Sequence, residues 1–162
     1  MSFRCAVAVI VLLTGCAPEN RLEGSVEELF PLDVSWVEVL RNDEALQVSY
    51  YRNRGADVDG VVRVTVALKD VDLDSGEPIP LQGEWSPGHP RTTVLHFPAG
   101  EPGRLFAPVK QGELELHEGG APGEETRGEF TMSFEQGDGF GAGRTLTGTF
   151  RATVQDAGFG DP

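Results

Sequence analysis

Apolar and polar residues alternate along most of the chain after residue 30, and this alternation predicts β-strands. In the segment VVRVTVAL at 61–68, for example, Val62, Val64 and Val66 share one face and Arg63 lies on the other. A repeat of two residues is the spacing of a strand with one buried face. The pattern recurs in seven or eight short segments, at 32–40, 45–52, 61–68, 78–85, 91–97, 112–118, 128–135 and 144–154.

The connections between these segments are rich in residues that favour turns. Glycine, proline, asparagine and aspartate concentrate at 41–44, 54–60, 86–88, 98–103 and 119–123. Short alternating strands separated by such turns are typical of antiparallel β-sandwiches and barrels. We therefore expect one all-β domain over residues 31–158, built as an antiparallel β-sandwich of about seven or eight strands, with a small closed β-barrel as the alternative.

Two hairpins are expected, one at each end of this domain. In the first, the facing side chains would be Val34, Trp36, Leu40, Leu46, Val48 and Tyr50. In the last, the loop over Gly137–Arg144 would join the final two strands. That loop superficially resembles a phosphate-binding loop, but it lacks the Lys-Ser/Thr ending and has strands on both sides, so we interpret it as a hairpin connection.

A glycine repeatedly stands two residues before a large apolar side chain. The instances are Gly83-Glu-Trp85, Gly112-Glu-Leu114, Gly128-Glu-Phe130 and Gly148-Thr-Phe150. Glycine inside a strand often marks a bend, a bulge or a place where another group approaches the backbone closely. We interpret the repetition as a shared way of entering the sheet rather than as an internal sequence repeat.

The N-terminus has the features of an export signal. Arg4 is the only charge before residue 16, and the apolar run over residues 5–13 is too short to cross a bilayer, which needs about 20 residues. A short positive head, an apolar middle and small residues before a cleavage point are typical of a secretory signal. The run ends on the tetrapeptide Leu13-Thr14-Gly15-Cys16.

This tetrapeptide resembles the lipobox of bacterial lipoproteins, and the resemblance covers about the first sixteen residues. It implies a signal peptide over 1–15 that is cut before Cys16, whose thiol carries a diacylglyceryl group. Ala17 stands where that family often has an inner-membrane retention aspartate. The resemblance thus favours a lipid-anchored position in the cell envelope, at the outer membrane of a Gram-negative bacterium. We expect residues 16–30 to form a flexible tether, in which Ser25 and Glu28 have the spacing of a capping box around one helical turn.

Composition limits the partners of the mature domain. The chain has 13 basic and 26 acidic residues, and loss of Arg4 with the signal leaves 12 basic ones and a net charge of −14. Such a surface argues against nucleic acid, which needs positive patches. Cys5 would leave with the signal and Cys16 would carry lipid, so we expect neither a disulfide nor a free thiol.

Asp70, Asp72 and Asp74 form the most suggestive group of ligand atoms. Their spacing matches the first half of a calcium-binding loop, in which positions one, three and five supply oxygen ligands. The match then fails, because Ser75 stands where glycine is needed and Leu81 where a bidentate glutamate is needed. The alternative is a solvated turn at the end of a strand.

A second polar group lies on one expected strand. Glu113, Glu115 and His117 share a face at intervals of about 6.5–7 Å. Two carboxylates at such a distance can act as an acid and base pair, and a glutamate–histidine stripe can supply metal ligands. The alternative is an ordinary solvent-exposed strand face, since no third ligand lies nearby in the sequence.

No catalytic or cofactor-binding residue is assigned from the sequence. His89 and His96 have no nucleophile motif around them, and Phe140 is interpreted either as a partner contact or as a plug that folds back.

We expect a non-catalytic interaction or structural module in the envelope with a protein partner. The alternatives are a small-ligand or calcium-binding protein and an envelope hydrolase. In a small-ligand carrier, the aromatic residues Trp36, Tyr51, Phe97 and Phe106 would line a cavity.

Overall fold

The computed structural model of the chain describes residues 19–156. The expected signal peptide and Cys16 lie outside the described residues, so cleavage and lipidation remain predictions. Within 19–156, no helix is both long and apolar enough to span a lipid bilayer.

The described chain is built from strands and two short 3₁₀ turns, which confirms the all-β prediction. Each of the eight alternating segments contains observed strand, because alternation of apolar and polar side chains suits a sheet with one buried face. The elements are β1 (Arg21–Glu23), η1 (Ser25–Glu28), β2 (Trp36–Arg41), β3 (Ala45–Arg54), β4 (Asp57–Ala67), η2 (Leu73–Ser75), β5 (Ile79–Pro80), β6 (Glu84–Ser86), β7 (His89–Pro90), β8 (Thr92–His96), β9 (Arg104–Leu105), β10 (Val109–Glu118), β11 (Glu125–Phe134) and β12 (Thr145–Asp156).

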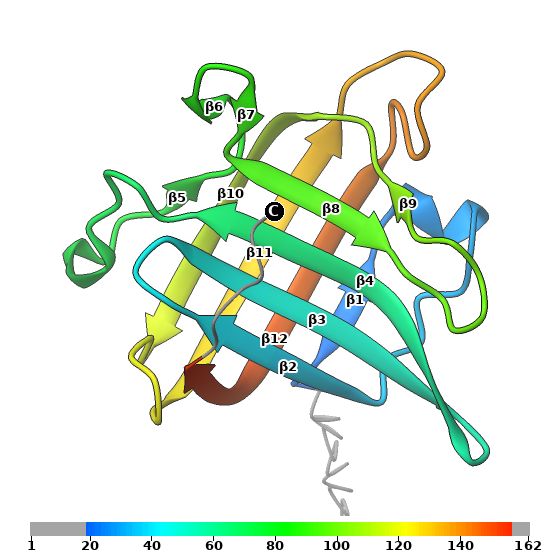
Figure 1. The fold of residues 1–162 in the computed structure, drawn as a ribbon, viewed down its shortest axis with the longest axis horizontal. Helices are drawn as coiled ribbons and strands as arrows, with labels where there is room; N and C mark the ends of the chain where they lie inside the picture. The colour runs from blue at the N-terminus through cyan, green and yellow to red at the C-terminus, as the bar shows by residue number, and fades with distance from the viewer. Residues whose placement is uncertain (1–18, 157–162) are drawn as a thin grey trace, which may run out of the picture.

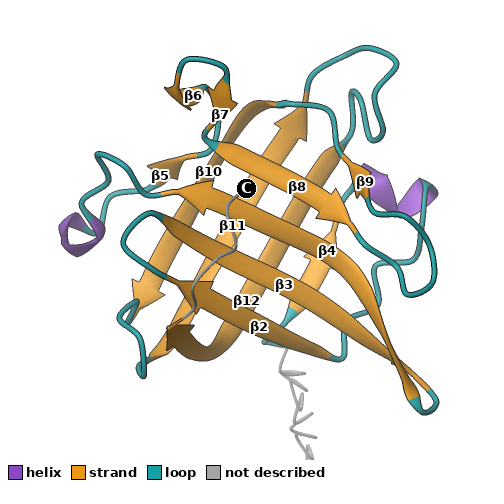
Figure 2. Ribbon diagram, viewed as in Figure 1, coloured by secondary structure: helices purple, strands orange, loops and turns teal. Residues whose placement is uncertain are grey.

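Ten of these strands form one curled sheet, and β6 pairs with β7 in a separate small one. The order in the large sheet is β5-β10-β11-β12-β2-β3-β4-β8-β9, with β1 paired to β12. The sheet curls into a half barrel, so that β2, β3, β4 and β8 cross in front of β10, β11 and β12 (Figures 1 and 2). The strands expected to make a sandwich thus belong to one continuous hydrogen-bonded path.

The two halves of the sheet meet through a parallel strand pair, which corrects the expectation of purely antiparallel pairing. Val154 and Asp156, at the end of β12, lie beside Val39 and Arg41 of β2, and the two strands run in the same direction. The physical reason is the length of β12. Its first part pairs with β11 and β1, and its last three residues extend beyond β1 to reach β2.

The space between the two halves is filled by large apolar side chains. Tyr50 of β3 is fully buried, and its ring meets Phe130 of β11 edge-on at a centroid distance of 6.1 Å. Its hydroxyl donates a hydrogen bond to the carbonyl of Thr149. Burial raises the pKa of the Tyr50 hydroxyl well above its usual value. This tyrosine therefore joins the two halves of the sheet through both packing and a hydrogen bond.

The first hairpin, β2–β3, forms as expected, but β2 presents its other face to the core. Val37 and Val39 are buried, whereas Trp36 is 37% exposed. Glu38 lies on the same face as Trp36 and Leu40, and burying its carboxylate would carry a large desolvation cost. The two valines therefore turn inward, and the predicted inward position of Trp36 was wrong.

The segment expected to be a tether is largely part of the domain. Leu22 in β1 and Val26 in η1 are buried, and β1 pairs with β12. Ser25 does not cap the turn. Its hydroxyl instead accepts a hydrogen bond from the backbone N–H of Thr145. The tether prediction is therefore wrong from residue 19 onward, because burial of the apolar side chains Leu22 and Val26 is favourable and holds this segment against the sheet.

Three of the four recurring glycines, Gly112, Gly128 and Gly148, mark close approach, whereas a Cβ at Gly83 would meet no atom within 4 Å. Gly128 lies opposite Phe150, and Gly148 lies opposite Phe130, in the β11–β12 ladder. A Cβ at Gly148 would lie 2.5 Å from Cζ of Phe130, and one at Gly128 would lie 2.6 Å from Cζ of Phe150. Each ring therefore occupies the space that a side chain on the facing strand would need.

Candidate functional site

The outer face of β10, β11 and β12 carries two like-charged pairs. The antiparallel register places Glu115 directly opposite Glu129 and Arg127 directly opposite Arg151. Like charges facing each other across a ladder destabilise a sheet unless something neutralises them. The two pairs differ in how far neighbouring side chains offset this repulsion.

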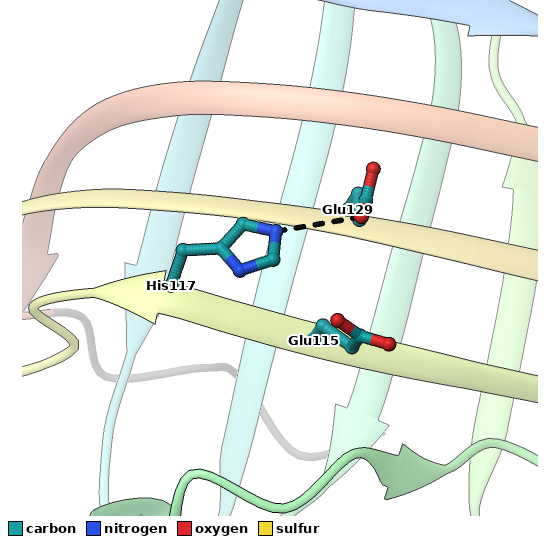
Figure 3. Close-up of side chains that lie close together, drawn as sticks. All are labelled: Glu115, His117 and Glu129. Carbon is teal, nitrogen blue, oxygen red and sulfur yellow. Dashed lines mark ion pairs between the residues drawn. The ribbon is translucent and has the colours of Figure 1, made fainter.

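Three side chains around the acidic pair converge, and we call Glu115, His117 and Glu129 the Glu–His–Glu cluster. One ligand atom from each lies within 4.8 Å of the others. Nε2 of His117 is 3.4 Å from Oε1 of Glu129, and both side chains are about half exposed. The imidazole of His117 points toward Glu129 across the two strands, while Glu115 lies beside it on β10 (Figure 3).

A register shift positions the histidine. Leu116 pairs with Gly128 and Glu118 pairs with Arg127, so His117 is the additional residue in β10. Such an irregularity bends the strand locally and can re-aim a side chain. Here it holds the imidazole on the outer face, close to Glu129.

The arginine pair beside the cluster is neutralised by carboxylates. Arg151 lies 2.7 Å from Glu19 and 2.5 Å from Glu125, and Arg127 lies 3.8 Å from the same Glu19 carboxylate. The hydrogen bonds to Glu125 and Glu19 raise the pKa of Arg151. The acidic pair is less well compensated, because Glu129 has only the imidazole of His117 nearby and the side chain of Glu115 makes no hydrogen bond or ion pair with any described residue.

A surface hollow adjoins the cluster. Its lining residues are Glu19, His117, Arg127, Gly128, Glu129, Thr149 and Phe150. His117 and Glu129 lie at its edge, and together with Glu115 they offer an imidazole nitrogen and two carboxylate oxygens, which are suitable ligands for a divalent transition metal.

Sequence reasoning found Glu115 and His117 but missed Glu129. Glu113, the expected partner of Glu115, lies opposite Thr131 instead. The alternation within 128–135 does show that Glu129 faces outward. The register of β11 against β10, which brings Glu129 to Glu115, is visible only in the folded sheet.

The aspartate group of the expected calcium loop lies in the connection between β4 and β5. Asp70 and Asp72 are exposed, and Asp70 adopts a left-handed backbone conformation with φ of 61°. The carbonyl of Asp72 accepts a hydrogen bond from the hydroxyl of Ser75 at 2.7 Å. The side chain of Asp74 lies outside the described ones, so calcium binding at this loop stays a prediction.

His96 and Phe140 pack against other aromatic residues, whereas His89 is exposed. The ring of His96 stacks on Phe30 at 3.8 Å, and its Nδ1 lies 2.6 Å from the carbonyl oxygen of Val61. His89 lies in the exposed β6–β7 hairpin. Phe140 folds back and meets Phe106 at a centroid distance of 4.8 Å, which is the plug alternative.

A second feature lies on the outer face of the other half of the sheet. Trp36 stacks on Tyr51 with centroids 4.0 Å apart, Tyr51 meets Phe97 edge-on at 5.6 Å, and the guanidinium of Arg63 lies 4.6 Å from the Phe97 centroid. We call these four residues the Trp36 patch. Three of the aromatic residues expected in a carrier cavity thus gather on an outer face.

Comparisons with protein-family models, curated proteins and solved structures found no match to this chain. The roles proposed for the two outer faces are therefore inferred from the geometry of their own residues.

Proposed function

We propose that this chain is a lipid-anchored protein of the bacterial cell envelope whose β-domain is a non-catalytic module that binds a protein partner. The anchor follows from the lipobox-like tetrapeptide that ends at Cys16. The binding role follows from the Trp36 patch.

The lipid would hold the domain close to the membrane. The described fold begins at Glu19, which is fixed to the sheet by Arg151 at 2.7 Å. Glu19 is three residues after Cys16, and three extended residues span at most about 11 Å. A flexible tether running to residue 30 would instead have allowed the domain to lie up to roughly 50 Å from the lipidated cysteine. The short connection would keep the end of the domain that carries Glu19 near the bilayer surface.

The Trp36 patch carries the binding proposal. Tryptophan, tyrosine and arginine are the residue types that dominate the energy of protein interfaces, and Trp36, Tyr51 and Arg63 supply one of each. Trp36 is 37% exposed, although its stacking on Tyr51 removes much of its ring from water. A rigid, partly exposed aromatic side chain loses little conformational freedom when a partner covers it.

The anchor is tested by metabolic labelling with a clickable palmitate analogue in the native cells. We expect label on the wild-type protein and on Cys5→Ser, and neither label nor membrane attachment on Cys16→Ser. Label that persists in Cys16→Ser, or a wild-type protein that never takes label, would contradict the anchor.

The binding role is tested with a photo-crosslinking amino acid at position 36. The matched control carries the same group at Thr131, on the outer face of the other half of the sheet. We expect a discrete adduct of one reproducible mass from position 36, which Arg63→Ala reduces, and no such adduct from position 131. Equal labelling from both positions would reject the patch as an interface.

A further inference from the structure

We propose that the Glu–His–Glu cluster binds one zinc ion, with Nε2 of His117 and one carboxylate oxygen each from Glu115 and Glu129 as ligands. This site is independent of the lipid anchor and of the Trp36 patch.

The spacing of the ligand atoms suits a tetrahedral metal. Zinc binds imidazole nitrogen and carboxylate oxygen at about 2.0–2.2 Å, so two such ligands of a tetrahedral ion lie about 3.4 Å apart. Nε2 of His117 and Oε1 of Glu129 are 3.4 Å apart. A charge-assisted hydrogen bond between them would be shorter, at about 2.7–2.9 Å. One ligand atom of the Glu115 carboxylate lies within 4.8 Å of both, so a rotation of this side chain would bring it to the ion.

The charge arrangement also favours a cation at this position. Glu115 and Glu129 face each other in register, and Glu115 has no counter-charge among the described residues. The adjacent pair, Arg127 and Arg151, is supplied with two carboxylates. A divalent cation between the glutamates would relieve the repulsion that the sheet otherwise retains.

The ligand types select zinc over calcium. Calcium takes six to eight oxygen ligands, whereas imidazole nitrogen suits zinc and its neighbours in the first transition row. Three protein ligands leave a fourth position of a tetrahedral zinc ion open. The neighbouring hollow is lined by His117 and Glu129, so that open position would face accessible surface.

The test is titration of zinc chloride into the full chain by isothermal calorimetry, in mild detergent and with Cys5→Ser and Cys16→Ser to remove both thiols. We expect one zinc per chain, and affinity at least tenfold lower for His117→Ala, with losses also for Glu115→Gln and Glu129→Gln. The matched control is His89→Ala, an exposed histidine outside the cluster, which should bind like the parent chain. Zinc should also raise the melting temperature of the parent chain but not that of His117→Ala.

Several results would reject the zinc site. Absence of zinc binding up to millimolar concentration would overturn the site, and so would equal affinity of the parent chain and His117→Ala. Calcium that binds as tightly as zinc and is insensitive to His117→Ala would show an acidic site without the imidazole, which also rejects the proposal. Circular dichroism of each variant without metal checks that these substitutions on the outer face leave the fold intact.

Discussion

The ring of Phe130 lies over Gly148 of the neighbouring strand, where a Cβ would come within 2.5 Å of the ring. The relationship is reciprocated two residues further along the ladder, where Phe150 lies over Gly128. These pairs let two phenylalanines lie along the inner face of β11 and β12 without pushing the strands apart. The same ring of Phe130 then meets Tyr50 from the other half of the sheet.

Gly148→Ala should lower the free energy of unfolding by about 2 kcal/mol, since overpacking a filled core forces side chains off their preferred rotamers. The added methyl group would also lie 2.8 Å from the hydroxyl oxygen of Tyr50. Urea denaturation measures the change. In a Phe130→Leu background, which replaces the ring by a smaller side chain, Gly148→Ala should lower the free energy of unfolding by less. An equal cost in both backgrounds would show that the ring contact is not the cause.

Asp59 should be a strong determinant of stability at the end of the β3–β4 hairpin. Its side chain is only 4% exposed, and its carboxylate lies 2.7 Å from Arg52 and 3.4 Å from Arg54. It also accepts a hydrogen bond from the backbone N–H of Ala99. Asp59→Asn should lower the free energy of unfolding by about 3 kcal/mol, because it removes the buried carboxylate that Arg52 and Arg54 share and leaves Arg52 only the more distant carboxylate of Asp33, at 3.7 Å. The control, Asp57→Asn on the same strand, is exposed and should change the free energy of unfolding by less than about 0.5 kcal/mol.

The same carboxylate should make the domain sensitive to acid. Burial alone would raise the pKa of Asp59, but hydrogen bonds from Arg52 and Ala99 and the charges of Arg54 and Arg52 lower it overall. A lowered pKa in the folded state stabilises the fold above the unfolded value of about 3.9, and this stabilisation is lost as pH falls through the folded pKa. The difference in unfolding free energy between wild type and Asp59→Asn should therefore be constant above about pH 5 and shrink below about pH 4. A difference that grows on acidification would contradict the assigned direction.

The N-terminal segment should contribute to stability as part of the domain. Val26 in η1 is fully buried, so Val26→Ala should lower the free energy of unfolding by about 2 kcal/mol. Its exposed neighbour provides the control, and Glu27→Ala should change the value by less than about 0.5 kcal/mol. Thermal or urea unfolding measures both. Two unchanged variants would restore the view that this segment is a free tether.

The candidate cluster shows how far sequence analysis reaches at a surface site. Alternation placed Glu115 and His117 on one outward face of a strand, and the structure agrees. Glu129 was equally visible as an outward residue of another strand, but nothing local in the sequence specifies which residue of β10 lies opposite it. Register depends on pairing between strands and on the shift at His117, and both are properties of the assembled sheet.

The sequence by itself determined that this is a β-protein, where most strands lie and which face of β4, β10, β11 and β12 is buried. These are local properties, because a strand needs only an alternating pattern and turn residues at its ends. Tertiary structure decided the inward face of β2, the burial of Val26 and the parallel meeting of β12 with β2. Each of these depends on contacts between residues far apart in the chain. Such contacts contribute free energy only when the two halves of the sheet pack around a common core.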